Sequence, residues 1–234
     1  MISDLTILDV VSLVAFVAVW TTYNTLFDGW LRRPNSINAK MIGIREMWMK
    51  RLLGRDNRIV DATLIGHSIR SATFFASTTI LVIAGLIGAL GAIERVHGTA
   101  VNLSTIFRTG SQPLFELKLL VLVTIFVYAF FKFTWAIRQF NYFSAIIGSA
   151  PDPGDEAGGG DLAHRMAQIL SRAVWQLNAG IRAYYFALAC LGWFIHPLFF
   201  MAMTVLMTMV LVRRQLHSFT AHGISDHLKA LGGR

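Results

Sequence analysis

The chain has 234 residues, of which 15% are charged and 55% are hydrophobic, with a mean hydropathy of +0.55. Soluble domains carry nearer a quarter of charged residues, so this composition argues against a soluble protein and for an integral membrane protein. The net charge of +8 does not predict a nucleic-acid partner, because the basic residues gather in particular loops, where they set orientation and contact anionic lipids. The single cysteine, Cys190, excludes a disulfide framework and a CxxC metal site.

The first predicted element is a membrane helix over residues 5–31. It lacks a basic leading segment, so we expect it to be retained rather than cleaved as a signal. Asp9, Phe16 and Asn24 share one face of this helix, and polar groups therefore mark both ends of that face. Asp9 could pair with Lys118, a basic residue early in a later helix, as a topological staple.

Residues 32–58 are strongly basic. By the positive-inside rule this segment is cytoplasmic, which places the N-terminus outside. Apolar residues recur at helical spacing over 37–52, and two interpretations stay open. The helix either lies in the headgroup plane or is a solvated helix packed on the bundle. The first alternative puts four residues in contact with lipid: Lys40, Trp48, Lys50 and Arg51.

Residues 58–92 read as one helix of roughly 50 Å, well beyond the roughly 30 Å hydrocarbon core of a bilayer. One stripe runs from His67 and Arg70 into small residues and suits packing against other helices, whereas the opposite isoleucine-rich stripe suits lipid. Small residues four apart allow close helix approach within a subunit or between subunits; they are Ala84, Gly85, Gly88, Ala89 and Ala92.

An outer loop is predicted over 94–116, a third long helix over 114–143, and a flexible acidic linker over 151–161. From Asp161, a plausible N-cap, a helix runs to residue 195, and Pro197 opens a second apolar run to 212. Either these two form one kinked helix, or a tight turn at 193–197 separates them. The positive-inside rule favours the turn, because it gives five spanning helices and a cytoplasmic tail over 215–234.

A set of polar residues falls near the inner edge of the predicted spans: Asn24, Asp28, Asp61, His67, Arg70, Lys132, Asn178 and Arg182. In a functional interpretation they line a basic vestibule that attracts anions, lipid phosphates or a charged partner segment. In a structural interpretation the long helices continue into the cytoplasm as a bundle held by ion pairs, and Lys132 extends its amine to the membrane–water interface. The structural one is preferred, because helix length alone places most of these groups near the edge.

No pattern of catalysis or cofactor binding is present. The seven histidines include no HExxH pair, the glycine run at residues 85–91 lacks the lysine of a phosphate-binding loop, and no GxSxG elbow occurs. We therefore predict no enzymatic activity, no metal and no cofactor.

Four strings resemble a known family: VDATLIGHSIRSATFFAST (60–78), WAIRQFNY (135–142), NAGIRAYYFALACLGWF (178–194) and VRRQLHS (212–218). Together they resemble the small polytopic membrane proteins of the domain-of-unknown-function family five-nine-nine. The resemblance covers nearly the whole chain outside the acidic linker. It implies a membrane protein but carries no catalytic residue, since no activity is assigned to the family.

The sequence predicts an all-α polytopic membrane helix bundle of four to five spans, forming one membrane domain over residues 1–234. Its predicted location is a bacterial inner membrane, with membrane lipids as partners. No inverted repeat of transporter type is visible, so a pore would form between subunits. The leading hypothesis is a homo-oligomeric channel or transport-type protein with a basic cytoplasmic vestibule. The alternative is an accessory subunit of a larger membrane complex.

Overall fold

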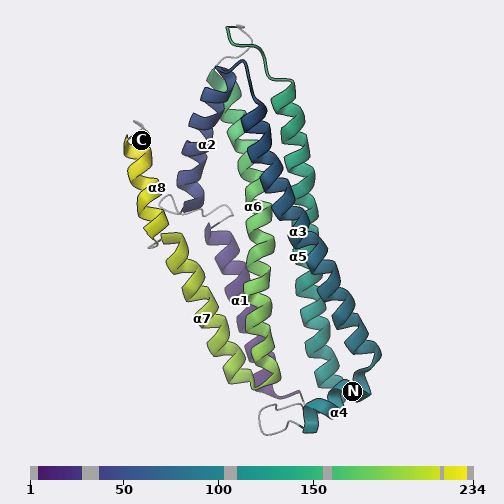
Figure 1. Ribbon diagram of the computed structural model, residues 1–234. Coiled ribbons are helices and arrows are strands. Elements are labelled where there is room, and N and C mark those ends of the chain that lie inside the picture. Colours follow the sequence, from purple (N-terminus) through teal and green to yellow (C-terminus); the bar gives the residue numbers. More distant parts are fainter. Residues whose placement is uncertain (1–4, 28–36, 103–109, 155–159, 217–218, 231–234) are drawn as a thin grey trace. The chain divides into compact units, whose positions relative to one another are not determined.

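The computed structural model describes residues 5–27, 37–102, 110–154, 160–216 and 219–230, and the described residues contain helices and no strand (Figure 1). The all-α prediction is therefore confirmed. The helices are α1 (Ile7–Phe27), α2 (Ile37–Leu53), α3 (Ile59–Gly91), α4 (Ile93–Asn102), α5 (Gln112–Gly148), α6 (Gly160–Leu191), the 3-10 turn η2 (Gly192–Phe194), α7 (Pro197–Leu216) and α8 (Phe219–Ala230).

Four of these helices are long and apolar enough to cross a membrane: α1, α3, α5 and α7. Within the described residues α6 is not among them, because its first half is amphipathic and carries charged and polar side chains such as Arg165, Gln168 and Arg172. The apolar helices define a multi-pass membrane protein.

The predicted turn between the last two apolar runs is confirmed. The chain leaves α6 through η2 and reverses into α7, which begins at Pro197, a favourable residue for a first helical turn (Figure 1). Gly192 permits this reversal, because a Cβ there would lie 3.1 Å from Phe199 Cδ1 and 3.3 Å from Phe200 Cα. The single kinked helix is thus excluded.

The structure adds two short helices to the prediction, α4 in the segment over 94–116 and α8 in the segment over 215–234. Helix α6 begins at Gly160, so Asp161 lies inside its first turn and is not the N-cap. Helix α8 lies beside α2, and a Cβ added at Gly43 would lie 3.3 Å from Leu228 Cδ2 (Figure 1). Contact between these helices is tertiary information that local sequence signals do not carry.

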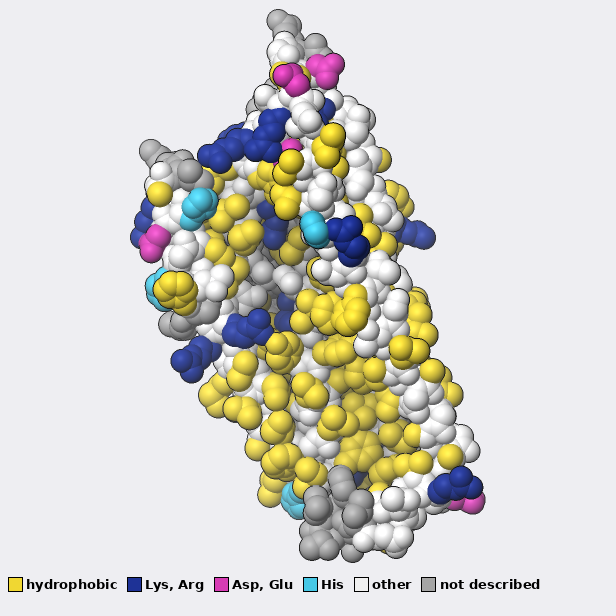
Figure 2. Space-filling model, viewed as in Figure 1, with side chains coloured by type: hydrophobic (Ala, Val, Ile, Leu, Met, Phe, Trp, Pro, Cys, Tyr) yellow, Lys and Arg dark blue, Asp and Glu magenta, His cyan; other side chains and the backbone are white. Residues whose placement is uncertain are grey.

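Residue contacts divide the chain into two compact units, and α3, α5 and α6 each contribute to both. Unit 1 comprises residues 1–24, 77–131 and 180–211, and unit 2 comprises residues 25–76, 132–179 and 212–234. On the face drawn in Figure 2, Lys and Arg side chains gather over unit 2, and hydrophobic side chains cover much of unit 1.

Unit 2 is held by a hydrophobic core between α2, the first half of α3, the second half of α5 and the first half of α6. Its alanines let the helices approach, and its large side chains fill the space between them. The core consists of Met49, Leu52, Ile65, Ala136, Phe140, Phe143, Ile147, Ala163, Met166, Ala167, Leu170 and Ala173.

Unit 1 has an aromatic core. Phe16 of α1 contacts Phe186 of α6 at 5.7 Å and Phe200 of α7 at 5.0 Å between ring centroids, and Trp20 stacks on Phe186 at 5.2 Å. Such pairs add to the free energy gained by burial alone. The predicted face of α1 is confirmed as its buried side, since Asp9 and Phe16 are 3% and 1% exposed.

The stripe of α3 predicted to pack against other helices is not its buried side, and Ile80 and Ile87 of the stripe predicted to face lipid are exposed, at 51% and 55%. Asp61, Ile65, Ala72 and Thr79 form its buried side, whereas the polar and small stripe predicted to pack is exposed. In hydrocarbon no hydrophobic effect selects which apolar face turns inward, and side-chain packing decides instead. Packing of this stripe between subunits stays a prediction.

Candidate functional site

The carboxylate of Asp61 is the centre of a buried polar cluster in unit 2. Its side chain is 1% exposed, Arg55 Nη1 lies 2.8 Å from Oδ1 and 3.0 Å from Oδ2, and Trp48 Nε1 donates to Oδ1 at 2.6 Å. The sequence reaches this geometry by breaking the helix at Gly54 and restarting it at Ile59, so that Arg55 folds back onto the first turn of α3. The cluster fixes the corner between α2 and α3.

Helix α2 packs on the core of unit 2, which supports the second of its two interpretations. Trp48 donates its indole N–H to Asp61 and packs against the core as a partly buried side chain, and its contact with lipid stays a prediction. Lys50 and Arg51 are exposed and Lys40 is half-buried, and their contact with anionic lipid stays a prediction.

A second polar chain links α2 to α6. His164 Nδ1 lies 3.0 Å from Glu46 Oε2, Lys50 Nζ lies 3.0 Å from Glu46 Oε1, and Gln168 Nε2 lies 2.8 Å from His164 Nε2. The hydrogen bond from His164, together with that from Lys50, lowers the pKa of Glu46 below its usual value of 4.5.

The sign of this shift predicts a pH dependence. A carboxyl whose pKa is lowered by folding stabilises the protein above its unfolded pKa, and this contribution is lost as pH falls through the folded pKa. Glu46→Gln should therefore lower the melting temperature at pH 7, and the difference from wild type should shrink below about pH 4. Thermal unfolding in detergent measures both, with Glu94→Gln on exposed α4 as the control. A difference that persists unchanged in acid would contradict the assignment.

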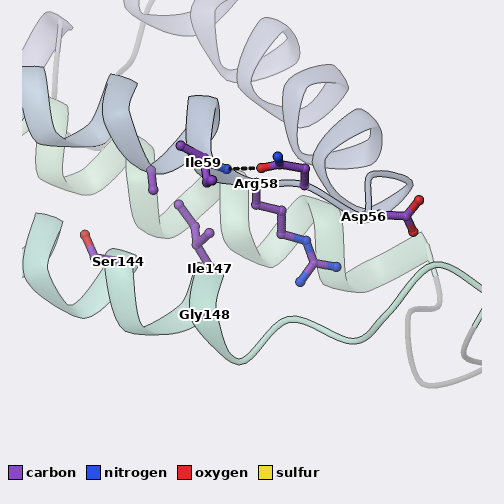
Figure 3. Close-up of a pocket in the computed structure, with 8 residues that line it drawn as sticks. Asp56, Arg58, Ile59, Ser144, Ile147 and Gly148 are labelled. Carbon is purple, nitrogen blue, oxygen red and sulfur yellow. Dashed lines mark hydrogen bonds between the residues drawn. The ribbon is translucent and has the colours of Figure 1, made fainter.

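An open groove of about 640 Å³ lies between the start of α3 and the end of α5 (Figure 3). Its lining includes Asn57, Arg58 and Ser144, and Asn57 Oδ1 accepts from the backbone N–H of Ile59 at 2.9 Å. Arg58 donates to the carbonyl of Ala150 at 2.7 Å and to that of Pro151. The guanidinium is therefore used to tie the acidic linker to the start of α3.

The structure does not bring Asp61 together with His67 and Arg70. Arg70 Nη2 lies 2.8 Å from His67 Nδ1 on the exposed side of α3, whereas Asp61 is on the buried side. Nine residues make about two and a half helical turns, so Asp61 and Arg70 must face opposite directions. Lys132 is half-buried on α5. Within a single chain, these predicted vestibule residues separate into local pairs.

In unit 1, Arg182 of α6 is 4% exposed and reaches α1. Its Nε donates to Asn24 Oδ1 at 3.3 Å, and its guanidinium lies 5.8 Å from the ring centroid of Tyr23. Two members of the predicted polar set, Arg182 and Asn24, are thus in contact. Asn178 is half-buried one turn earlier, and Asp28 lies outside the described residues.

The predicted meeting of Asp9 and Lys118 is organised by Trp193. Lys118 Nζ donates to the carbonyl of Trp193 at 2.9 Å, and Trp193 Nε1 donates to Asp9 Oδ1 at 2.8 Å. Asp9 and Lys118 are 3% and 2% exposed. The staple therefore joins α1, α5 and η2, and no local sequence pattern indicates that the indole completes it.

Unit 1 also carries an apolar groove of about 680 Å³ at the ends of α3 to α7. Among the described residues of its lining Thr99 is the one polar side chain, so this part of the groove offers mainly hydrocarbon contact. The lining residues are Leu86, Val96, Thr99, Ala100, Phe115, Leu119, Leu122, Leu188, Leu191, Gly192, Phe194, Ile195, Phe199 and Met203.

Across the described residues, no three His, Cys, Asp or Glu side chains gather in a way that could hold a metal ion. Besides Trp193, the sequence analysis missed the polar contacts that Arg55 and Arg45 make in unit 2. The signal for Arg45 was available, since Asn38, Arg45, Met49 and Leu52 follow one another at helical spacing on one face of α2, and all four are buried.

Apolar spanning helices with charged groups held in buried pairs define a polytopic α-helical membrane protein. Residues 11–220 match the family model described as "Protein of unknown function, DUF599", and the chain belongs to that family. No curated protein and no solved structure matches the chain significantly.

Proposed function

We propose that this protein is a homo-oligomeric membrane protein of the channel or transport type, assembled through the exposed stripe of α3. The observation that carries the proposal is the direction of that stripe. His67, Arg70, Ser77, Gly85 and Gly88 all face away from the chain's own helices, and a Cβ added at either glycine meets no atom within 4 Å.

Polar side chains on a spanning helix are costly against lipid, and they face protein or a watered path instead. Small residues let a second helix approach closely. A stripe that combines both on one exposed face therefore fits a neighbouring subunit, with His67 and Arg70 forming a basic entrance near the shared axis. Because Asp61 of unit 2 faces away from His67 and Arg70, an entrance built from the exposed pair would take in several copies of the chain.

The orientation that accompanies this proposal follows from charge. The basic segment over 32–58 and the pair Arg213 and Arg214 favour the cytoplasmic side, with the N-terminus outside. The reversal at η2 is consistent with α6 serving as a fifth span, shielded from lipid by the surrounding helices.

The stripe is tested by cysteine cross-linking in native membranes. Gly88→Cys should give a disulfide-linked dimer on mild oxidation, because the stripes of neighbouring subunits lie close together around the shared axis. Leu120→Cys on α5, which is 50% exposed, is the matched control and should stay monomeric. The native Cys190 is buried and should not react.

Assembly and transport are then separated. Gly88→Leu should reduce the oligomer seen by native mass spectrometry, and Arg70→Ala should reduce anion flux into liposomes without dissociating the oligomer. Co-purification at fixed stoichiometry with a different protein, without self-cross-linking, would instead support the accessory subunit. A monomer with no partner and no flux would overturn both.

A further inference from the structure

Arg45 is a buried cation in the core of unit 2. It is 7% exposed and shares a face of α2 with Met49 and Leu52, which are both 0% exposed. Its Nη1 donates to Ser171 Oγ of α6 at 3.1 Å, and Ser171 is 0% exposed. Among the described residues this is the one hydrogen bond that the Arg45 side chain makes.

One neutral hydroxyl does not compensate a guanidinium. The group carries five N–H donors, and burial of a charge without an opposite charge costs several kcal/mol. Burial lowers the pKa of Arg45 to about 10, so the side chain is still charged at neutral pH.

In unit 2, the described carboxylates that form ion pairs form them with cations other than Arg45. Glu46 pairs with Lys50 and His164, and Asp61 pairs with Arg55. The remaining ones are Asp161 with Arg165 on α6 and Asp226 with Lys229 on α8. Asp56 and Asp152 are exposed, and in the part of the chain that the structure describes no ion pair joins Arg45 to a carboxylate.

We propose that Arg45 and Ser171 form a binding site for a phosphate group, either the headgroup of a phospholipid or inorganic phosphate. The planar guanidinium presents paired N–H donors that match two phosphate oxygens, and the serine hydroxyl supplies a further donor. On the face drawn in Figure 2 the surface is hollowed beside α2, and Lys or Arg side chains show within the hollow, which offers an anion a basic approach. The site does not depend on how subunits assemble.

The test is thermal unfolding of the purified full chain in an uncharged detergent, with phosphate titrated against chloride at equal ionic strength. Wild type should be stabilised by phosphate with a saturable dependence. Arg45→Met should unfold at a higher temperature than wild type without phosphate, because an uncompensated buried charge has been replaced by an apolar side chain of similar length. Its apparent phosphate affinity should be at least about tenfold weaker.

Arg51→Met is the matched control, since it removes an exposed arginine from the same helix and should keep the phosphate response. Ser171→Ala should retain the fold and weaken phosphate binding by a smaller factor. Equal responses to phosphate and chloride, an unchanged response in Arg45→Met, or a destabilised Arg45→Met would each overturn the proposal.

The two sources of phosphate are distinguished with nanodiscs. If a lipid headgroup binds, discs containing phosphatidic acid should stabilise wild type more than Arg45→Met, and discs of phosphatidylcholine alone should stabilise both equally. If the site takes the free anion, inorganic phosphate should retain its effect in phosphatidylcholine discs. An absence of both effects would count against the site.

Discussion

Replacing Arg55 with methionine should destabilise the protein by about 3 kcal/mol, the lower end of the cost of leaving one member of a buried ion pair alone. The cost comes from Asp61, whose side chain is 1% exposed, and not from Arg55, whose side chain is 44% exposed. Trp48 still donates to the carboxylate in this variant, which keeps the effect from being larger. Unfolding in detergent by denaturant or heat measures it.

The reciprocal change should cost less. Asp61→Asn keeps an oxygen that accepts from Trp48, and the released Arg55 can turn to water, so about 1 kcal/mol is expected. The double variant should match Asp61→Asn rather than the sum of the two, because the damage of Arg55→Met requires a charged Asp61. Additive effects would show that the pair is not coupled and would contradict the cluster.

Lys118→Met should destabilise unit 1 by about 3 kcal/mol, because it leaves Asp9 buried without the nearby cation while Trp193 and Thr6 still donate to the carboxylate. It also removes the donor to the carbonyl of Trp193 at the turn between α6 and α7. Trp193→Phe should cost about 1–3 kcal/mol, since it removes the indole donor to Asp9 while keeping a ring to stack on Phe200.

Arg95→Met is the control for this series, because Arg95 is exposed on α4 and its loss should change stability by less than about 0.5 kcal/mol. Fluorescence size-exclusion with heating compares the variants in one detergent. A Lys118→Met protein as stable as wild type would show that the staple does not hold α1, α5 and η2 together.

The sequence determined the helical class and the main helices. Runs of apolar residues longer than a bilayer is thick identify α1, α3 and α5, and Pro197 with the arginine pair after α7 identifies the last turn. The amphipathic helices α4 and α8 were missed, since short polar segments form helices only when the surrounding structure supports them.

The tertiary structure decided which residues meet. Asp61 and Arg70 lie on one helix, and their spacing alone places them on opposite sides, but only packing shows that Asp61 is the buried one. Likewise, Trp193 joins Asp9 to Lys118 although 184 residues separate it from Asp9. Hydropathy predicts where a chain can cross the membrane, because insertion of a helix into the hydrocarbon core depends on its apolar composition. Which face of each helix turns inward depends on side-chain fit and hydrogen-bond partners from distant segments, and these exist only in the folded chain.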